Sequence, residues 1–304
     1  MKPQHIALML LICAIWGGNF VVTKLAVGHF PPVLFTALRF GVVAVLMVPW
    51  LRWKPGQMRN VVIAAICMGT LHFALIIIGI ALADDVAVVA VVTQLGVPIV
   101  TLMAVVLLGE RIRWKRSLGI ALAFAGTLVI SFDPKVMNYQ VAIGLLLVAV
   151  IVYSFGQITV RRIRDVDTFT MQAWVGILSA PSLLAISLLL EKNHVEQTMA
   201  ASAWHWGAVL YAGIAVSLIG HGGTYYLLRR YPVSVVNPGF TLAPIFGVLG
   251  GVFFLDEQLS GRVLVGSAIV LLGVLIVALR EGKVADARGV PAGKAALETK
   301  GVGE

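Results

Sequence analysis

The residues that could do chemistry in this sequence are polar side chains inside long apolar segments, where an unpaired polar group is costly. The candidates are Trp16, Asn19, His72, Gln94, Tyr153, Gln157, Ser217, His221 and Tyr225. Many recur at a spacing of three or four, which places them on one face of a helix. The clearest series is Gly213, Ser217, His221 and Tyr225. We expect such faces to line a wet cavity, and because they are mostly neutral they favour a small neutral or zwitterionic solute.

Helix packing is the alternative explanation for the small residues, because glycine lets two helices approach closely. We expect packing at Gly119, Gly126, Gly266, Gly273 and the Gly247-x-x-x-Gly251 pair. The stripe from Gly213 to Tyr225 is expected to line the cavity instead, because helix packing does not explain a histidine and a tyrosine in the membrane interior.

Three ionisable residues within the segments leave two interpretations each. Arg39 either binds a substrate carboxylate or reaches the outer interface and braces a neighbouring helix, and we favour the brace. His72 and His221 can titrate near neutral pH, so one of them either couples proton movement to solute movement or is a hydrogen-bonded structural residue. Because Asp and Glu are missing from mid-segment positions, movement down a gradient is a serious option.

Motifs for catalysis and metal binding are missing from the sequence. It contains no G-x-x-x-x-G-K-[ST] phosphate loop, no H-E-x-x-H pair and no nucleophile elbow. Cys13 and Cys67 lie in apolar segments and are expected to be small packing residues. We therefore expect no catalytic residue, no metal ion and no cofactor, in a protein that is not an enzyme.

The composition predicts a membrane protein. Hydrophobic residues make up 60% of the 304 residues and charged residues only 12%, far from the soluble average. Apolar runs of about 20 residues, the length of helix that crosses a bilayer, recur along the chain. Ten spans are predicted, at 5–26, 32–51, 60–82, 86–108, 115–132, 141–160, 168–190, 204–228, 233–255 and 262–280. The first is too long for a signal peptide and lacks the small-residue cleavage site.

Part of this pattern occurs twice. The matched pairs are Glu110 with Glu257, Gly119 with Gly266 and Gly126 with Gly273, each 147 residues apart, and Pro98 with Pro244, 146 apart. An internal repeat within apolar segments is typical of transporters. Each proline removes a hydrogen bond near the middle of its span. We predict hinges at Pro98 and Pro244, with a tolerated kink as the alternative.

The placement of Lys and Arg predicts the orientation in the membrane. With the amino terminus in the cytoplasm, most of the 23 fall in cytoplasmic segments. Lys135, Lys192 and Arg262 lie on the opposite side, and Lys24 and Arg39 lie within the spans. The net charge of +9 thus reflects topology and contact with anionic lipid, not nucleic acid. Because each half has five spans, the halves insert in opposite orientations and both termini are cytoplasmic.

These features define the fold class as all-α integral membrane, with ten transmembrane helices arranged as two inverted five-helix repeats. The predicted units are residues 1–134, residues 138–280 and a disordered cytoplasmic tail at 281–304, which mixes charged residues with Gly and Ala.

Two stretches carry a family resemblance. W-G-G-N-F at Trp16–Phe20, with Lys24, and P-P-x-x-F-x-A-L-R-F at Pro31–Phe40 resemble the start of an EamA-type repeat, and the two proline–glutamate–glycine stretches resemble its end. Over all ten spans the chain is similar to the drug/metabolite transporter superfamily, and within it to bacterial amino-acid exporters. The resemblance implies a central substrate cavity between the halves and export of small metabolites. The second half departs from the motif at Tyr153–Gly156, which reads Y-S-F-G, and has no arginine that matches Arg39.

The sequence therefore predicts a secondary transporter of a bacterial inner membrane that exports small neutral or zwitterionic metabolites, amino acids first, by alternating access. Its expected partners are a small-molecule substrate and membrane lipid, not nucleic acid. Phosphorylated sugars and nucleotides are disfavoured because the mid-membrane region lacks a group of Lys and Arg. Two alternatives remain open: an integral membrane enzyme that acts on lipid, and a passive channel.

Overall fold

The computed structural model describes residues 2–108, 114–133, 137–160, 163, 165–228, 240 and 242–287, and in these residues helices joined by short loops are found and no strand. The α-helices are α1 (Pro3–Val27), α2 (Pro32–Met47), α3 (Met58–Ala65), α4 (His72–Leu82), α5 (Val86–Val92), α6 (Gly96–Leu108), α7 (Trp114–Ser131), α8 (Gln140–Val160), α9 (Thr168–Leu190), α10 (His194–Met199), α11 (Ala203–Leu210), α12 (Gly222–Leu228), α14 (Ala243–Leu255) and α15 (Gly261–Ala287). The π-helical segments η2 (Ile66–Leu71) and η5 (Tyr211–His221) join α3 to α4 and α11 to α12. Short 3₁₀ turns occupy η1 (Val48–Trp50), η3 (Thr93–Leu95) and η4 (Met137–Tyr139).

Among the residues that the structure describes, seven helices are long and apolar enough to cross a bilayer. They are Pro3–Val27, Pro32–Trp50, Met58–Leu82, Val86–Leu107, Gln140–Val160, Thr168–Leu190 and Ala203–Thr224. Three shorter apolar helices are Ser117–Ile130, Ala243–Leu255 and Gly261–Ile276. Lipid offers no hydrogen bonds, so apolar runs satisfy their backbone groups internally as helix. The protein is a multi-pass membrane protein, and each predicted span contains helix in the described part of the chain.

The predicted boundaries differ from the structure near the carboxyl terminus. Most of the ninth span before α14 lies outside the described residues, as does Glu110. Helix α15 continues to Ala287, past the predicted end at residue 280. The remainder of the expected tail, 288–304, is outside the described residues.

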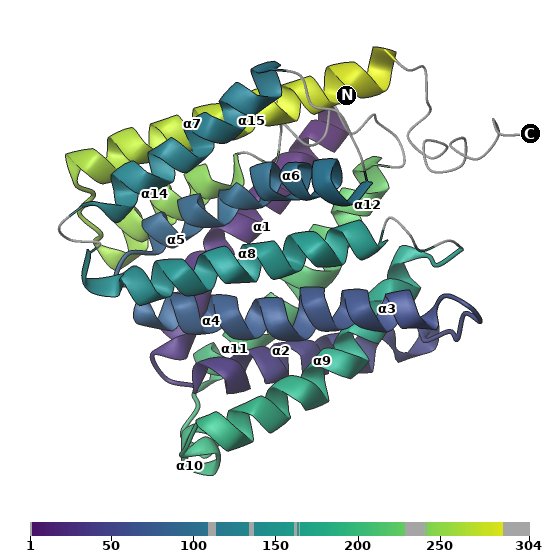
Figure 1. Cartoon of the computed structure of the whole chain (residues 1–304). Coiled ribbons are helices and arrows are strands. Elements are labelled where there is room, and N and C mark those ends of the chain that lie inside the picture. The colour runs from purple at the N-terminus through teal and green to yellow at the C-terminus, as the bar shows by residue number, and fades with distance from the viewer. Residues whose placement is uncertain are drawn as a thin grey trace, which may run out of the picture.

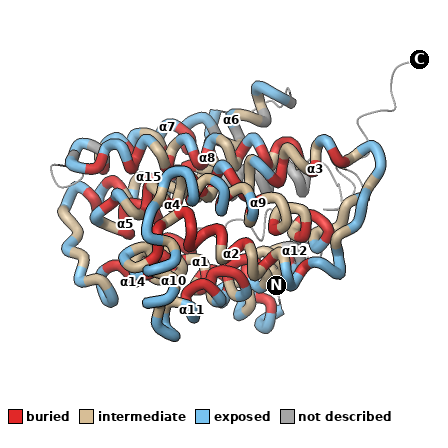
Figure 2. The backbone as a smooth tube through the Cα atoms, turned by 90° about the horizontal axis from the view of Figure 1, so that it is seen from below, coloured by how far each residue is buried: buried red, intermediate tan, exposed pale blue. Residues whose placement is uncertain are grey.

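The long helices lie side by side in one bundle (Figure 1). Buried residues gather along the interior and exposed residues face outward (Figure 2). Large apolar side chains are among the most exposed, including Leu189 at 83%, Val106 at 80% and Phe254 at 76%. A soluble monomer rarely presents such surfaces, whereas lipid tails cover them without cost.

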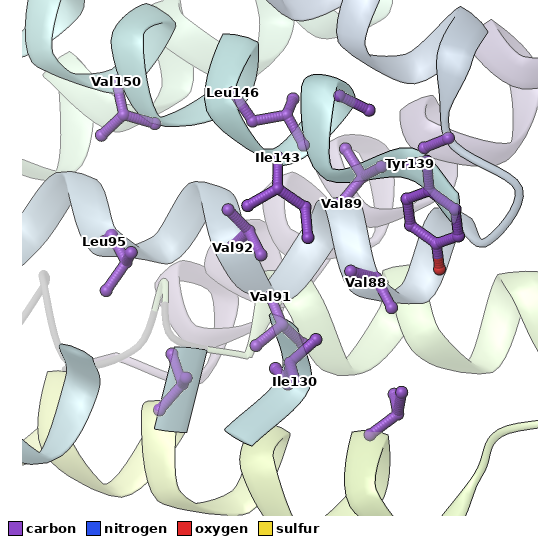
Figure 3. Packing of buried hydrophobic residues seen from close by; sticks show 14 of the residues in the cluster. Val88, Val89, Val91, Val92, Leu95, Ile130, Tyr139, Ile143, Leu146 and Val150 are labelled. Carbon is purple, nitrogen blue, oxygen red and sulfur yellow. The ribbon is translucent and has the colours of Figure 1, made fainter. Parts of the chain in front are cut away.

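Helix α5 is the most enclosed element. All seven of its residues are buried, as expected for a helix that is apolar on every side. Val88, Val89, Val91 and Val92 belong to a cluster with Leu146 of α8 and Ile130 of α7, which Figure 3 shows from close by. This cluster joins helices from both halves of the chain.

Helices α7 and α15 pack against each other through glycine, side by side in Figure 1. A Cβ atom on Gly126 would lie 2.7 Å from the carbonyl oxygen of Gly266, and one on Gly273 would lie 2.5 Å from the carbonyl oxygen of Gly119. The four glycines are therefore helix contacts, and the packing prediction for them is confirmed. Since Gly119 meets Gly273 and Gly126 meets Gly266, the two helices run antiparallel.

The two prolines occupy different positions. Pro98 is the third residue of α6, but α5 and the 3₁₀ turn Thr93–Leu95 precede α6 without a break, so the proline lies inside one continuous span. The 3₁₀ turn interrupts this span where the proline cannot bond to the Gln94 carbonyl. Pro244 lies in the first turn of α14 rather than in the middle of a described helix. Because first-turn N–H groups have no intrahelical acceptor, Pro244 costs α14 no hydrogen bond.

A carboxylate joins the end of α14 to the start of α5. Glu257 accepts hydrogen bonds from the backbone N–H groups of Val86, at 2.5 Å, and Ala87, at 3.1 Å. Nearby, the Lys24 ammonium donates to the carbonyls of Ile80, at 3.2 Å, and Ala83, at the end of α4. The charges at this end of the bundle therefore fix helix termini.

Candidate functional site

A cavity of about 240 Å³ lies between α1, α2, α4, η3, α8, η5 and α14. Six of the predicted site residues line it: Trp16, Asn19, His72, Gln94, Tyr153 and His221. Its volume is below the range of about 300–1,000 Å³ typical of pockets for drug-sized ligands, so it suits a small solute. The polar residues that the sequence singled out from five separate spans thus meet in one place.

A second cavity of about 60 Å³ adjoins the first. Arg39, Phe73, Tyr153 and His221 line both cavities, and Ser217 lines the smaller one. We call the larger one the central cavity and the smaller one the side cavity. Arg39 is the only Asp, Glu, Lys or Arg among the described residues that line either cavity.

Two predicted residues are not placed in these cavities. Gln157 of α8 is half-buried and lines neither of them. Tyr225 belongs to α12, but its side chain lies outside the described part of the structure.

Arg39 is more central than the sequence indicated. Its side chain is only 4% exposed, and its Nε and Nη2 atoms donate to the Ser217 hydroxyl at 3.3 and 3.1 Å. The guanidinium carbon lies 4.5 Å from the centre of the Phe73 ring and 5.6 Å from that of Phe40, within the range of cation–π attraction. The expectation that Arg39 extends to the outer interface is wrong, because the side chain turns inward, although it does join α2 to η5.

His72 has a defined tautomer. Its Nδ1 lies 2.9 Å from the carbonyl oxygen of Ala149, and because a carbonyl can only accept, Nδ1 carries the hydrogen. In the neutral ring, Nε2 is then an acceptor. The imidazole centre is 4.6 Å from that of Tyr153 across the cavity wall. The structure thus gives His72 the hydrogen-bonded position of a structural residue while leaving one nitrogen for a ligand.

Trp16 and Asn19 supply the wall from α1. The Trp16 ring lies 5.5 Å from His221 and 5.2 Å from Phe240, centre to centre. Asn19 Oδ1 is buried and accepts no hydrogen bond. Buried polar atoms are nearly always paired, so this oxygen marks a position where a donor is missing.

The stripe of residues at spacing four does not form one face. Residues 211–221 are π-helical, and the Ser217 hydroxyl donates to Ala212, five residues back, at 3.1 Å. Gly213 packs on α2, where an added Cβ would lie 2.8 Å from Val42. Ser217 and His221 do face a cavity, so the prediction holds for these two and is wrong for Gly213.

Several lining residues escaped the sequence analysis because they are apolar. Phe35 of α2 and Phe73 and Ile77 of α4 line the central cavity. In sequence, such residues cannot be distinguished from packing residues. Among the described residues, no three His, Cys, Asp or Glu are grouped to hold a metal ion.

The fold and site define a multi-pass membrane protein with an internal cavity that holds several polar side chains between apolar walls. The model of the EamA-like transporter family matches residues 4–132 and 140–279. The chain belongs to this family of membrane transporters.

Two relatives carry the name "Probable amino-acid metabolite efflux pump". The Escherichia coli K12 protein is 24% identical, over 91% of this chain and 95% of its own. The Salmonella typhimurium LT2 protein is 26% identical, over 88% of this chain and 93% of its own. A solved crystal structure that is 19% identical shares the fold with a TM-score of 0.60, over 94% of this chain and all of the other.

Proposed function

We propose that the protein exports small neutral or zwitterionic metabolites, amino acids first among them, across a bacterial inner membrane. The observation that carries this is the central cavity, which is small, lies between helices of both halves of the chain, and is lined by neutral polar groups and one arginine among aromatic and aliphatic walls. The relatives named as amino-acid metabolite efflux pumps support the same cargo.

The proposed mechanism is alternating access between two inverted five-helix halves, with both termini in the cytoplasm. Three observations support it. The family model matches each half of the chain. The contact between Gly126 and Gly266 also has an equivalent: 147 residues after Gly126 lies Gly273, 147 residues before Gly266 lies Gly119, and these two glycines are in contact as well. Equivalent helices that pack antiparallel are what a twofold axis in the membrane plane produces. Helices α2 and α9 also pack antiparallel, since Glu191 after α9 accepts from the N–H groups of Val33 and Leu34 at the start of α2.

Counterflow in proteoliposomes tests the transport function. Vesicles preloaded with a mixture of unlabelled neutral amino acids are expected to accumulate a labelled one transiently and with saturation, whereas a phosphorylated sugar should have no effect. A passive channel would give flux that does not saturate and no counterflow. If no amino acid stimulates uptake, amino acids are not the cargo.

The hinge at Pro98 can be tested against Pro244. Replacing Pro98 with alanine restores an N–H group that can bond to the Gln94 carbonyl, so we expect a straighter span and initial counterflow rates several-fold lower, with unchanged expression. Pro244→Ala is the matched comparison, and we expect a smaller effect because the first turn of α14 loses no constraint of that kind. Unchanged rates in Pro98→Ala would show that the 3₁₀ turn is only a tolerated kink.

A further inference from the structure

The central cavity contains a buried cation whose counter-ion is missing. Arginine stays protonated in proteins, and burying a charge is costly unless it is paired. Arg39 is 4% exposed, and its hydrogen-bond partner is the neutral hydroxyl of Ser217. No carboxylate in the described part of the chain pairs with the guanidinium, and neither cavity is lined there by Asp or Glu.

The geometry of the guanidinium specifies the missing partner. It presents five N–H donors in a planar fork, which matches the two oxygens of a carboxylate. One hydroxyl oxygen takes two of these donors, from Nε and Nη2. A cargo carboxylate would supply both the charge and a second acceptor oxygen, which Ser217 cannot.

Two atoms that can accept hydrogen bonds from a cargo lie in the same cavity. Asn19 Oδ1 is buried with no hydrogen-bond partner. His72 uses Nδ1–H on the Ala149 carbonyl, which leaves Nε2 as an acceptor. An ammonium group carries three donors and no acceptor, so it complements these atoms as a carboxylate complements Arg39.

We propose that Arg39 binds the carboxylate of the cargo and Asn19 its amino group, so that the cargo is a free α-amino acid in its zwitterionic form. This proposal rests on the transport function and narrows its substrate class. An amine without a carboxylate would meet the uncompensated charge of Arg39. A phosphate monoester would bring about two negative charges to a single arginine. Trp16, Phe35 and Phe73 form the apolar wall for the amino-acid side chain.

Binding to the purified protein tests the proposal separately from transport. The probes are leucine, phenylalanine and threonine, each compared with its amide, with the amine that lacks the carboxylate and with the acid that lacks the amino group. Affinity is read from Trp fluorescence, since Trp16 lines the cavity, and from thermal stabilisation. Wild-type protein is expected to bind at least one amino acid about tenfold to hundredfold more tightly than its amide or amine, the range for hydrogen bonds to charged groups.

Two substitutions should change different preferences. Arg39→Gln should remove the preference for acid over amide, because binding of the amino acid weakens while binding of the cationic amide does not. Asn19→Leu should keep that preference and reduce the preference for the amino acid over the acid that lacks the amino group. Arg52→Gln, at an exposed arginine, is the control for loss of a positive charge. A merely structural role of Arg39 would weaken all probes together.

The outcomes separate this proposal from the proposed function. The carboxylate site is overturned if wild-type protein shows no acid preference in any series, or if Arg39→Gln keeps it, even when amino acids show counterflow. The transport proposal fails alone if the binding pattern appears without counterflow. If Arg39→Gln does not fold, Arg39→Lys is the deciding variant, because lysine keeps the positive charge but lacks the planar fork of N–H donors. Binding of the amino acid should then fall about tenfold while binding of its amide stays unaffected. An equal loss of binding for both probes would overturn the proposal.

Discussion

Replacing Gly273 with leucine is expected to remove most of the folded protein. A Cβ at this position would lie 2.5 Å from the backbone nitrogen of Ala123 and 2.5 Å from the carbonyl oxygen of Gly119. These atoms belong to the backbone of α7 and cannot turn aside as a side chain could, so α7 and α15 must separate. Overpacking in a filled interior costs about 1–3 kcal/mol, and a leucine against backbone belongs at or above the upper end. The measurement is the yield of monodisperse protein and its apparent melting temperature in detergent.

Gly144 provides the matched control for this substitution. It lies on an exposed face of α8, and an added Cβ would have no atom within 4 Å. Gly144→Leu should therefore leave yield and melting temperature unchanged. Equal stability of the two leucine variants would contradict the close packing of α7 on α15.

The second large effect is expected at Glu257. Its carboxylate is the acceptor for the first two N–H groups of α5, on the buried residues Val86 and Ala87. Glu257→Ala leaves both donors without a partner, and each unpaired buried group costs about 1–3 kcal/mol. We expect a clear loss in melting temperature at pH 7.5, with an intermediate loss in Glu257→Gln, which keeps one acceptor oxygen.

The same residue should show a pH signature. Burial raises the pKa of the Glu257 carboxyl above 4.5, even though the N–H groups of Val86 and Ala87 act in the opposite direction. A raised pKa means that the folded protein holds the proton more tightly than the unfolded chain. The resulting stabilisation is complete below pH 4.5 and is lost as the pH rises through the raised pKa. Glu257→Gln should lack this component, and Glu196→Gln, at an exposed residue, should keep it. Identical pH profiles for wild type and Glu257→Gln would contradict this assignment.

The sequence was most informative where lipid imposes a cost. The apolar runs predicted where the helices lie. Polar side chains inside those runs are costly and therefore stand out as candidate site residues, and six of them meet in the central cavity. The paired glycines were predictable as contacts because close approach of helices requires them.

The remaining features depend on distances that a sequence does not contain. The sequence predicts that Arg39 reaches the interface, because a charged side chain in an apolar segment usually does so. Only the structure shows that Arg39 turns inward and is buried without a carboxylate partner in the described part of the chain. Gly213 shares the spacing of Ser217 and His221, and only the position of α2 shows that Gly213 packs against a helix instead of the cavity. Pro244 was placed within a helix, although α14 begins beside it. Phe73 looks like any packing residue until its contact with Arg39 is seen.

The two π-helical segments fall at corresponding positions in the two halves of the chain. Residues 66–71 of η2, moved by the 147-residue offset of the repeat, become 213–218, which fall within η5. A π-turn closes with one more residue than an α-turn and is rare, so two such segments at corresponding positions agree with the inverted repeat proposed above. Each segment has a histidine at its end, His72 immediately after η2 and His221 as the last residue of η5, so each irregular segment ends where an imidazole meets the central cavity.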